Sequence, residues 1–132
     1  MENLAHGENY YKNALVLAYL GDSVFSLMVR EFLVEKYDYK PNILNKKANS
    51  VVCAKTQANI MAQIQNELTE EEQDIVKRAR NAHLSNNKAK NSTIQEYKLA
   101  TQFEALIGFW YLNKDKEKLD NLFKNYIVEK LW

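Results

Sequence analysis

Apolar side chains recur along this chain at the three- and four-residue spacing that places them on one face of a helix. Polar stretches separate about six such segments. The expected helices cover residues 11–37, 43–49, 51–64, 69–80, 94–112 and 115–131. Thr69 with Glu72, and Thr93 with Glu96, have the spacing of capping boxes, which begin helices. The pattern therefore predicts a single all-α domain over residues 1–132.

The composition agrees with this prediction and excludes several other classes of protein. With three glycines and one proline in 132 residues, the chain has too few turn formers for a β-sandwich or barrel. It also lacks the glycine-rich loop of the common nucleotide-binding sites. The longest apolar run, residues 14–20, is too short to cross a bilayer, so we expect no membrane partner. Because Cys53 is the only cysteine, no intramolecular disulfide can form, and we expect a cytoplasmic protein.

Two acidic residues interrupt the apolar faces of the predicted helices. Asp22 has apolar residues three, four and seven positions away, and Glu104 shares its face with mostly apolar and small residues. A carboxylate in such surroundings costs free energy unless it is paired or binds a metal ion. Gly21 beside Asp22, and Gly108 near Glu104, leave room for another group to approach.

These acids allow two interpretations. In the first, they converge on a divalent cation, and their hard oxygen ligands suit a magnesium ion that keeps several waters. In the second, each acid is satisfied by a lysine, an arginine or a tyrosine hydroxyl within the fold. The spacing alone does not choose between them.

Charge is unevenly distributed, although the net charge is only +1. Residues 67–76 hold five acids and no base, whereas residues 77–98 hold six bases and one acid. The basic segment suits a phosphate backbone, and its candidate contacts are Arg78, Arg80, Asn81, Lys88, Lys90 and Asn91. No aromatic residue lies among them, which favours a duplex recognised by shape over a single strand stacked on rings. The alternative is a solvated surface with no ligand.

Two short segments carry a resemblance to a known family. They are Leu17-Ala18-Tyr19-Leu20-Gly21-Asp22-Ser23 and Phe103-Glu104-Ala105-Leu106-Ile107-Gly108, and they resemble the two acidic signatures of the ribonuclease III family. Supporting matches lie in the same order at residues 45–48, 54–58, 78–82 and 97–101. The resemblance covers residues 14–131 and is strongest to the short bacterial branch that lacks a double-stranded-RNA-binding domain.

The resemblance implies an all-helical endonuclease domain that acts as a homodimer and cleaves double-stranded RNA with Mg²⁺. Asp22 and Glu104 would be its catalytic, metal-binding carboxylates. Lys46, Lys47, Lys55 and Gln57, which lie within the supporting matches or beside them, are further expected RNA contacts. In this branch the resemblance also implies maturation of the large-subunit (23S) ribosomal RNA precursor, with a ribosomal protein as a candidate partner. The first predicted helix is apolar on more than one face, which fits either a dimer interface or a central buried helix.

The chain departs from the pattern of the full-length enzymes at two positions. Ala18 and Thr101 stand where those enzymes have two further acids, so any metal ion would keep more waters here. A duplex-RNA-binding, ribosome-associated module with weak or no catalysis is therefore an alternative function. A helical protein–protein adaptor, with the basic segment as a solvated surface, is a third.

Overall fold

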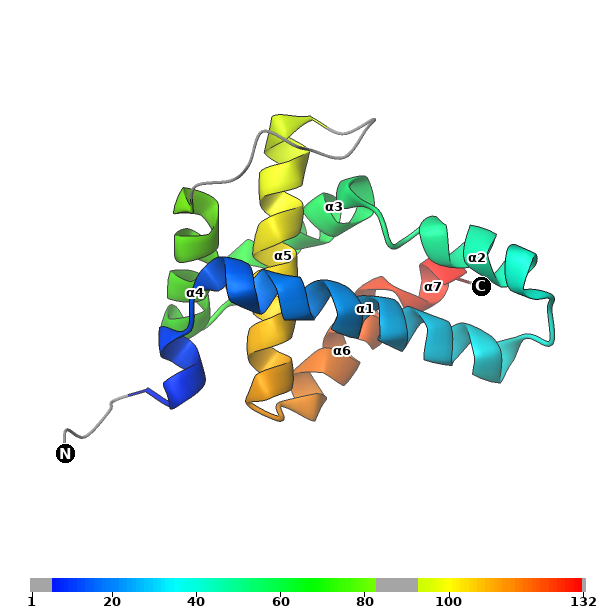
Figure 1. The fold of residues 1–132 in the computed structure, drawn as a ribbon, viewed down its shortest axis with the longest axis horizontal. Coiled ribbons are helices and arrows are strands. Elements are labelled where there is room, and N and C mark those ends of the chain that lie inside the picture. Colours follow the sequence, from blue (N-terminus) through cyan, green and yellow to red (C-terminus); the bar gives the residue numbers. More distant parts are fainter. Residues whose placement is uncertain (1–5, 83–92, 132) are drawn as a thin grey trace.

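The computed structural model describes residues 6–82 and 93–131, and within these ranges it contains helices and no strand (Figure 1). The elements are the short 3-10 helices η1 (Glu8–Tyr11) and η2 (Gln65–Glu67) and the helices α1 (Ala14–Lys36), α2 (Pro41–Asn49), α3 (Ala54–Ile64), α4 (Glu70–Asn81), α5 (Ile94–Leu112), α6 (Lys116–Tyr126) and α7 (Val128–Leu131). The all-α prediction is confirmed. The last predicted helix is interrupted at Ile127, which separates α6 from α7.

Local capping explains where several of these helices begin. The Asn13 side chain accepts hydrogen bonds from the backbone nitrogens of Leu15 and Val16, so α1 begins at Ala14 and not at residue 11. Both predicted capping boxes are formed, at Thr69 and at Thr93. These short-range bonds satisfy amide groups that a helix end leaves without partners. The start of α4 and of α5 therefore follows from sequence.

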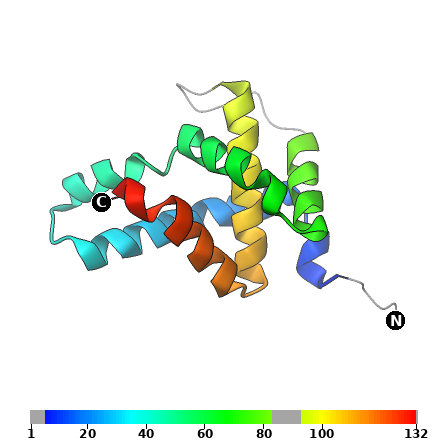
Figure 2. The same cartoon turned by 180° about the vertical axis from the view of Figure 1, so that it is seen from behind.

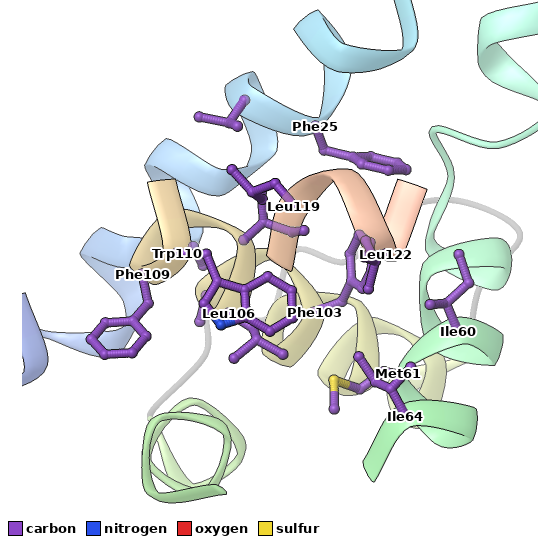
Figure 3. Close-up of a cluster of buried hydrophobic side chains, with 14 of the residues drawn as sticks. Phe25, Ile60, Met61, Ile64, Phe103, Leu106, Phe109, Trp110, Leu119 and Leu122 are labelled. Carbon is purple, nitrogen blue, oxygen red and sulfur yellow. The ribbon is translucent and has the colours of Figure 1, made fainter. Parts of the chain in front are cut away.

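The arrangement centres on α5, which α1 and α3 cross on opposite sides (Figures 1 and 2). Helix α4 also packs against α5, and α6 contacts its C-terminal part. Inside this arrangement, the rings of Phe25 and Phe103 meet edge to face with centroids 5.0 Å apart. Figure 3 shows these rings with the apolar side chains that α3, α5 and α6 contribute to the same cluster. No helix in the described ranges is long and apolar enough to cross a membrane.

The crossing of α1 and α5 brings their backbones into direct contact at Gly21 and Gly108. A Cβ atom added at Gly21 would overlap the carbonyl oxygen of Glu104 and lie 2.9 Å from the backbone nitrogen of Gly108. A Cβ atom added at Gly108 would overlap the carbonyl oxygen of Leu17. The room that the two glycines leave is therefore occupied by the opposite helix, and not by a ligand.

A buried acid ties α4 to α5 and α6. The Glu72 side chain is 4% exposed, and one of its oxygens accepts hydrogen bonds from Trp110 Nε1, at 2.8 Å, and from the Lys118 ammonium. The other oxygen completes the capping box at the Thr69 nitrogen, 2.9 Å away. Burial alone would raise the pKa of the Glu72 carboxyl, but these hydrogen bonds and the Lys118 charge together lower it. Glu72 is thus a fully compensated structural carboxylate.

We predict that Gly21→Ala destabilises the fold by about 3 kcal/mol or more, because the new methyl group would force two helix backbones apart. Denaturant unfolding of the variant and the parent protein measures this difference. Gly7→Ala is the matched control, since a Cβ there would meet nothing within 4 Å. Equal stability of the Gly21 variant and the control would contradict the contact between α1 and α5.

Candidate active site

The crossing of α1 and α5 also brings the two singled-out acids together. Asp22 directly follows Gly21, and Gly21 contacts the backbone of Glu104. Asp22 and Glu104 are therefore neighbours although they lie 82 positions apart in the sequence. Asp22 is exposed and Glu104 is half-buried. The apolar neighbours of Asp22 on α1, Ala18, Phe25 and Val29, are buried, whereas the Asp22 side chain itself is exposed to solvent.

The environment of Glu104 disfavours its charged form. Burial, the charge of Asp22 and a hydrogen bond with the Asp22 carboxyl group together raise the pKa of Glu104 to about 8. A hydrogen bond from Gln57 opposes them. The Glu104 carboxyl group therefore favours its protonated form near neutral pH unless a cation lies beside it.

A basic or phenolic partner does not account for these acids. In the part of the chain that the structure describes, no lysine, arginine or tyrosine is among the groups that shift the pKa of Glu104. The ion pairs found there join other residues, including Glu72 with Lys118 and Asp74 with Arg78. The second interpretation of the sequence, an acid satisfied within the fold, therefore finds no support at Glu104.

The donor set fits a hard divalent cation that keeps part of its water shell. Carboxylate oxygens are the ligands that Mg²⁺ prefers, and Mg²⁺ is commonly held by one or two of them. Residues 6–82 and 93–131 contain no group of three or more acidic, histidine or cysteine side chains that could hold a metal ion. Ala18 is buried, and the buried Thr101 donates its hydroxyl hydrogen to the Tyr97 carbonyl oxygen, 3.0 Å away. Neither position therefore replaces the missing acids.

Gln57 lies at this site and not on an exposed basic surface. Its side chain is 3% exposed, in the first turn of α3, and it hydrogen-bonds with Glu104. Contact between Gln57 and RNA stays a prediction, and the low exposure of the side chain gives a phosphate little access to its amide. The helical spacing from Gln57 to Ile60, Met61 and Ile64, all buried, is the signal in the sequence that points to an inward position.

The other expected RNA contacts fall into three groups. Some are exposed on the surface: Lys46, Lys55, Arg80 and Asn81. Lys47 is half-buried, with its ammonium nitrogen 4.7 Å from the centroid of the Tyr37 ring. Lys88, Lys90 and Asn91 lie outside the described residues.

Arg78 is already engaged within the fold. Its guanidinium donates to the carbonyl oxygens of Tyr10 and Lys12, the latter at 3.2 Å, and its Nε lies 3.5 Å from a carboxylate oxygen of Asp74. The Tyr10 hydroxyl donates to the same aspartate. These contacts hold the segment before α1 against α4. Arg78 therefore has a structural role that its position in a basic segment of the sequence does not reveal.

The fold and the paired acids are those of a helical nuclease domain, and comparison with known proteins identifies the family. Residues 15–115 match the family model of the Ribonuclease III domain. The chain belongs to the ribonuclease III family and is an endoribonuclease of that type.

Its relatives include short members of this family. The chain is 50% identical over 107 residues to the Mini-ribonuclease 3 of Brevibacillus brevis, covering 81% of this chain and 79% of the relative. It is 42% identical over 121 residues to the Mini-ribonuclease 3 of Enterococcus faecalis, covering 90% of each. Its fold is similar to the crystal structure of a protein from Fusobacterium nucleatum, with a TM-score of 0.82, 36% identity, and coverage of 92% of this chain and 96% of that one.

We predict that Asp22→Asn lowers the pKa of Glu104 below about 8. The substitution removes the negative charge next to Glu104, while burial keeps the pKa above its ordinary value of 4.5. Carboxyl-carbon NMR titration of Glu104 without added metal ions measures the change. Asp38→Asn, at an exposed position beyond the end of α1, is the control. An unchanged Glu104 titration in the Asp22 variant would show that the two carboxyl groups do not interact.

Proposed function

We propose that this endoribonuclease cleaves double-stranded RNA and depends on magnesium, with Asp22 and Glu104 as its catalytic, metal-binding carboxylates. The observation that carries the proposal is the contact between these two acids at the α1–α5 crossing, where no described residue gives Glu104 a basic partner. A bound Mg²⁺ would supply a water of lowered pKa and polarise the scissile phosphate. Asp22, at the exposed edge, and Glu104, behind it, would hold that ion facing the solvent, where a phosphate can approach.

The exposed basic residues support a duplex RNA substrate. Lys46, Lys55, Arg80 and Asn81 would contact the phosphates and sugars of the backbone, which position a duplex without reading its sequence. Binding through such contacts weakens steeply as salt rises, because bound cations are released from the RNA. The resemblance to the short branch of the family supports the 23S ribosomal RNA precursor as substrate, a ribosomal protein as candidate partner, and the cytoplasm as location.

A homodimer belongs to the same proposal. Helix α1 buries one face in the core and exposes a second apolar face, which includes Val16, Tyr19, Leu27 and Val34. The Tyr19 side chain is 83% exposed and that of Val34 is 67% exposed. Exposed apolar surface of this extent along one helix is typical of a protein interface. Central burial therefore describes one face of α1, and the exposed apolar face supports the proposed dimer.

One observation favours the alternative of a binding module with weak or no catalysis. The buried Ala18 and Thr101 add no carboxylate, so residues 6–82 and 93–131 supply two acids with which this site could bind a metal ion. A magnesium titration separates the two functions. The proposed enzyme cuts duplex RNA as magnesium is added, whereas the binding module retains the duplex and cuts it at no concentration. An adaptor protein would show no salt-sensitive RNA binding.

We predict that Asp22→Asn reduces cleavage of long duplex RNA at least about 100-fold, because it removes one of two metal-binding carboxylates. Gel analysis of the products with and without magnesium measures the loss. Duplex binding without a metal ion should be retained, since the fold and the basic residues are unchanged. Asp38→Asn should cleave like the parent protein. Normal cleavage by the Asp22 variant would disprove the catalytic assignment.

We predict that Tyr19→Lys shifts the protein from dimer to monomer, because it places a charge in the exposed apolar face of α1. Sedimentation velocity at several protein concentrations measures the change. Ile94→Lys is the control, since Ile94 is also well exposed but lies in the first turn of α5. If the Tyr19 variant and the parent protein sediment alike, the dimer does not use this face.

A further inference from the structure

Four polar or charged residues are buried in the described part of the chain, and Gln57 is the one among them that reaches the candidate active site. Glu72 and Thr101 are satisfied by the partners described above. Gln102, on α5, is 2% exposed, and its Oε1 has no hydrogen-bond partner. The Gln57 side chain instead hydrogen-bonds with Glu104 across the contact between α3 and α5.

Burying an amide group costs free energy unless it forms hydrogen bonds. The Gln57 amide nitrogen can donate to the Glu104 carboxylate, which as an ionised group only accepts. Such a bond restricts rotation of the carboxyl group and leaves its remaining oxygen lone pairs available to a cation. Groups that orient a metal-binding side chain in this way commonly change the affinity for the metal by 10–100-fold.

Contacts from two helices therefore surround the Glu104 carboxyl group. Asp22 approaches it from α1, at the solvent edge, and Gln57 approaches it from α3, in the interior. Because Asp22 is exposed and Gln57 is buried, a cation entering from solvent would meet the Asp22 side of Glu104. Gln57 is placed to support Glu104 from behind without contacting the cation or the RNA.

We infer that Gln57 is a positioning residue, which holds the Glu104 carboxylate in the orientation that binds the catalytic metal ion. The inference rests on the proposed magnesium site and extends it to a third helix. It also assigns Gln57 a role that acts through Glu104 and not through a direct contact with RNA.

The test compares Gln57→Leu with Gln102→Leu. Both variants replace a buried glutamine by an apolar residue of similar size, but only the first removes a hydrogen bond to Glu104. Manganese, a spectroscopic substitute for magnesium, is titrated without RNA and followed by electron paramagnetic resonance. We expect Gln57→Leu to bind Mn²⁺ about 10-fold or more weakly. Gln102→Leu should bind it like the parent protein.

Cleavage kinetics provide a second measurement. Its expected result would not arise if Gln57 only stabilised the fold. At limiting Mn²⁺, Gln57→Leu should lower kcat and leave KM for the duplex unchanged, and excess Mn²⁺ should restore most of the lost rate. Duplex affinity without a metal ion should equal that of the parent protein. If Gln57→Leu loses its helical circular dichroism, Gln57→Met, which keeps an unbranched chain of similar length, is measured by the same criteria.

The possible outcomes distinguish a failure of the role inferred for Gln57 from a failure of the proposed magnesium site. Equal Mn²⁺ affinity of the parent protein and the folded Gln57 variant overturns the inference and leaves the metal site intact. A loss of duplex affinity with unchanged Mn²⁺ affinity also overturns it, and makes Gln57 an RNA contact. If the parent protein and Asp22→Asn show the same absence of Mn²⁺ binding, the proposed metal site itself fails.

Discussion

The contact between the backbones of α1 and α5 at Gly21 and Gly108 is the constraint on which the rest of this structure depends. No side chain larger than hydrogen fits between the two helices there, so the glycines set how closely they approach. The same approach places Asp22 next to Glu104, one on each helix. It also allows the rings of Phe25 and Phe103, a turn or so away, to meet in the core. The crossing of α1 and α5 therefore contributes both to the stability of the fold and to the candidate active site.

Two buried or half-buried glutamates show how differently this fold treats a carboxyl group. Glu72 receives hydrogen bonds from an indole, an ammonium and a backbone amide, and its pKa is lowered. Glu104 receives one from Gln57, faces a second acid, and has its pKa raised to about 8. The first arrangement stabilises the fold in the charged state. The second remains unfavourable until a proton or a cation is present, which is the property expected of a binding site and not of a structural ion pair.

The basic residues also have two different roles. Some form contacts within the fold, and others are exposed on the surface. Arg78 holds the segment before α1 against α4, whereas Lys46, Lys55 and Arg80 extend into solvent. A surface that binds a phosphate backbone needs charges without internal partners, because an engaged guanidinium must first break its own hydrogen bonds. The proposed RNA interface is therefore smaller than the basic segments of the sequence suggest. Its exposed members lie on α2, α3 and α4, whereas the candidate active site is built by α1, α3 and α5.

The sequence by itself determined the helical class, the caps of α4 and α5, and the identity of the two acids. Periodicity and capping act between residues a few positions apart, so one chain is enough to read them. Only the tertiary structure decided what occupies the space beside Gly21 and Gly108, that Asp22 is exposed, and that Gln57 is buried against Glu104. Each of these depends on packing between helices far apart in sequence. Residue spacing along one helix carries no information on which neighbour will cover it.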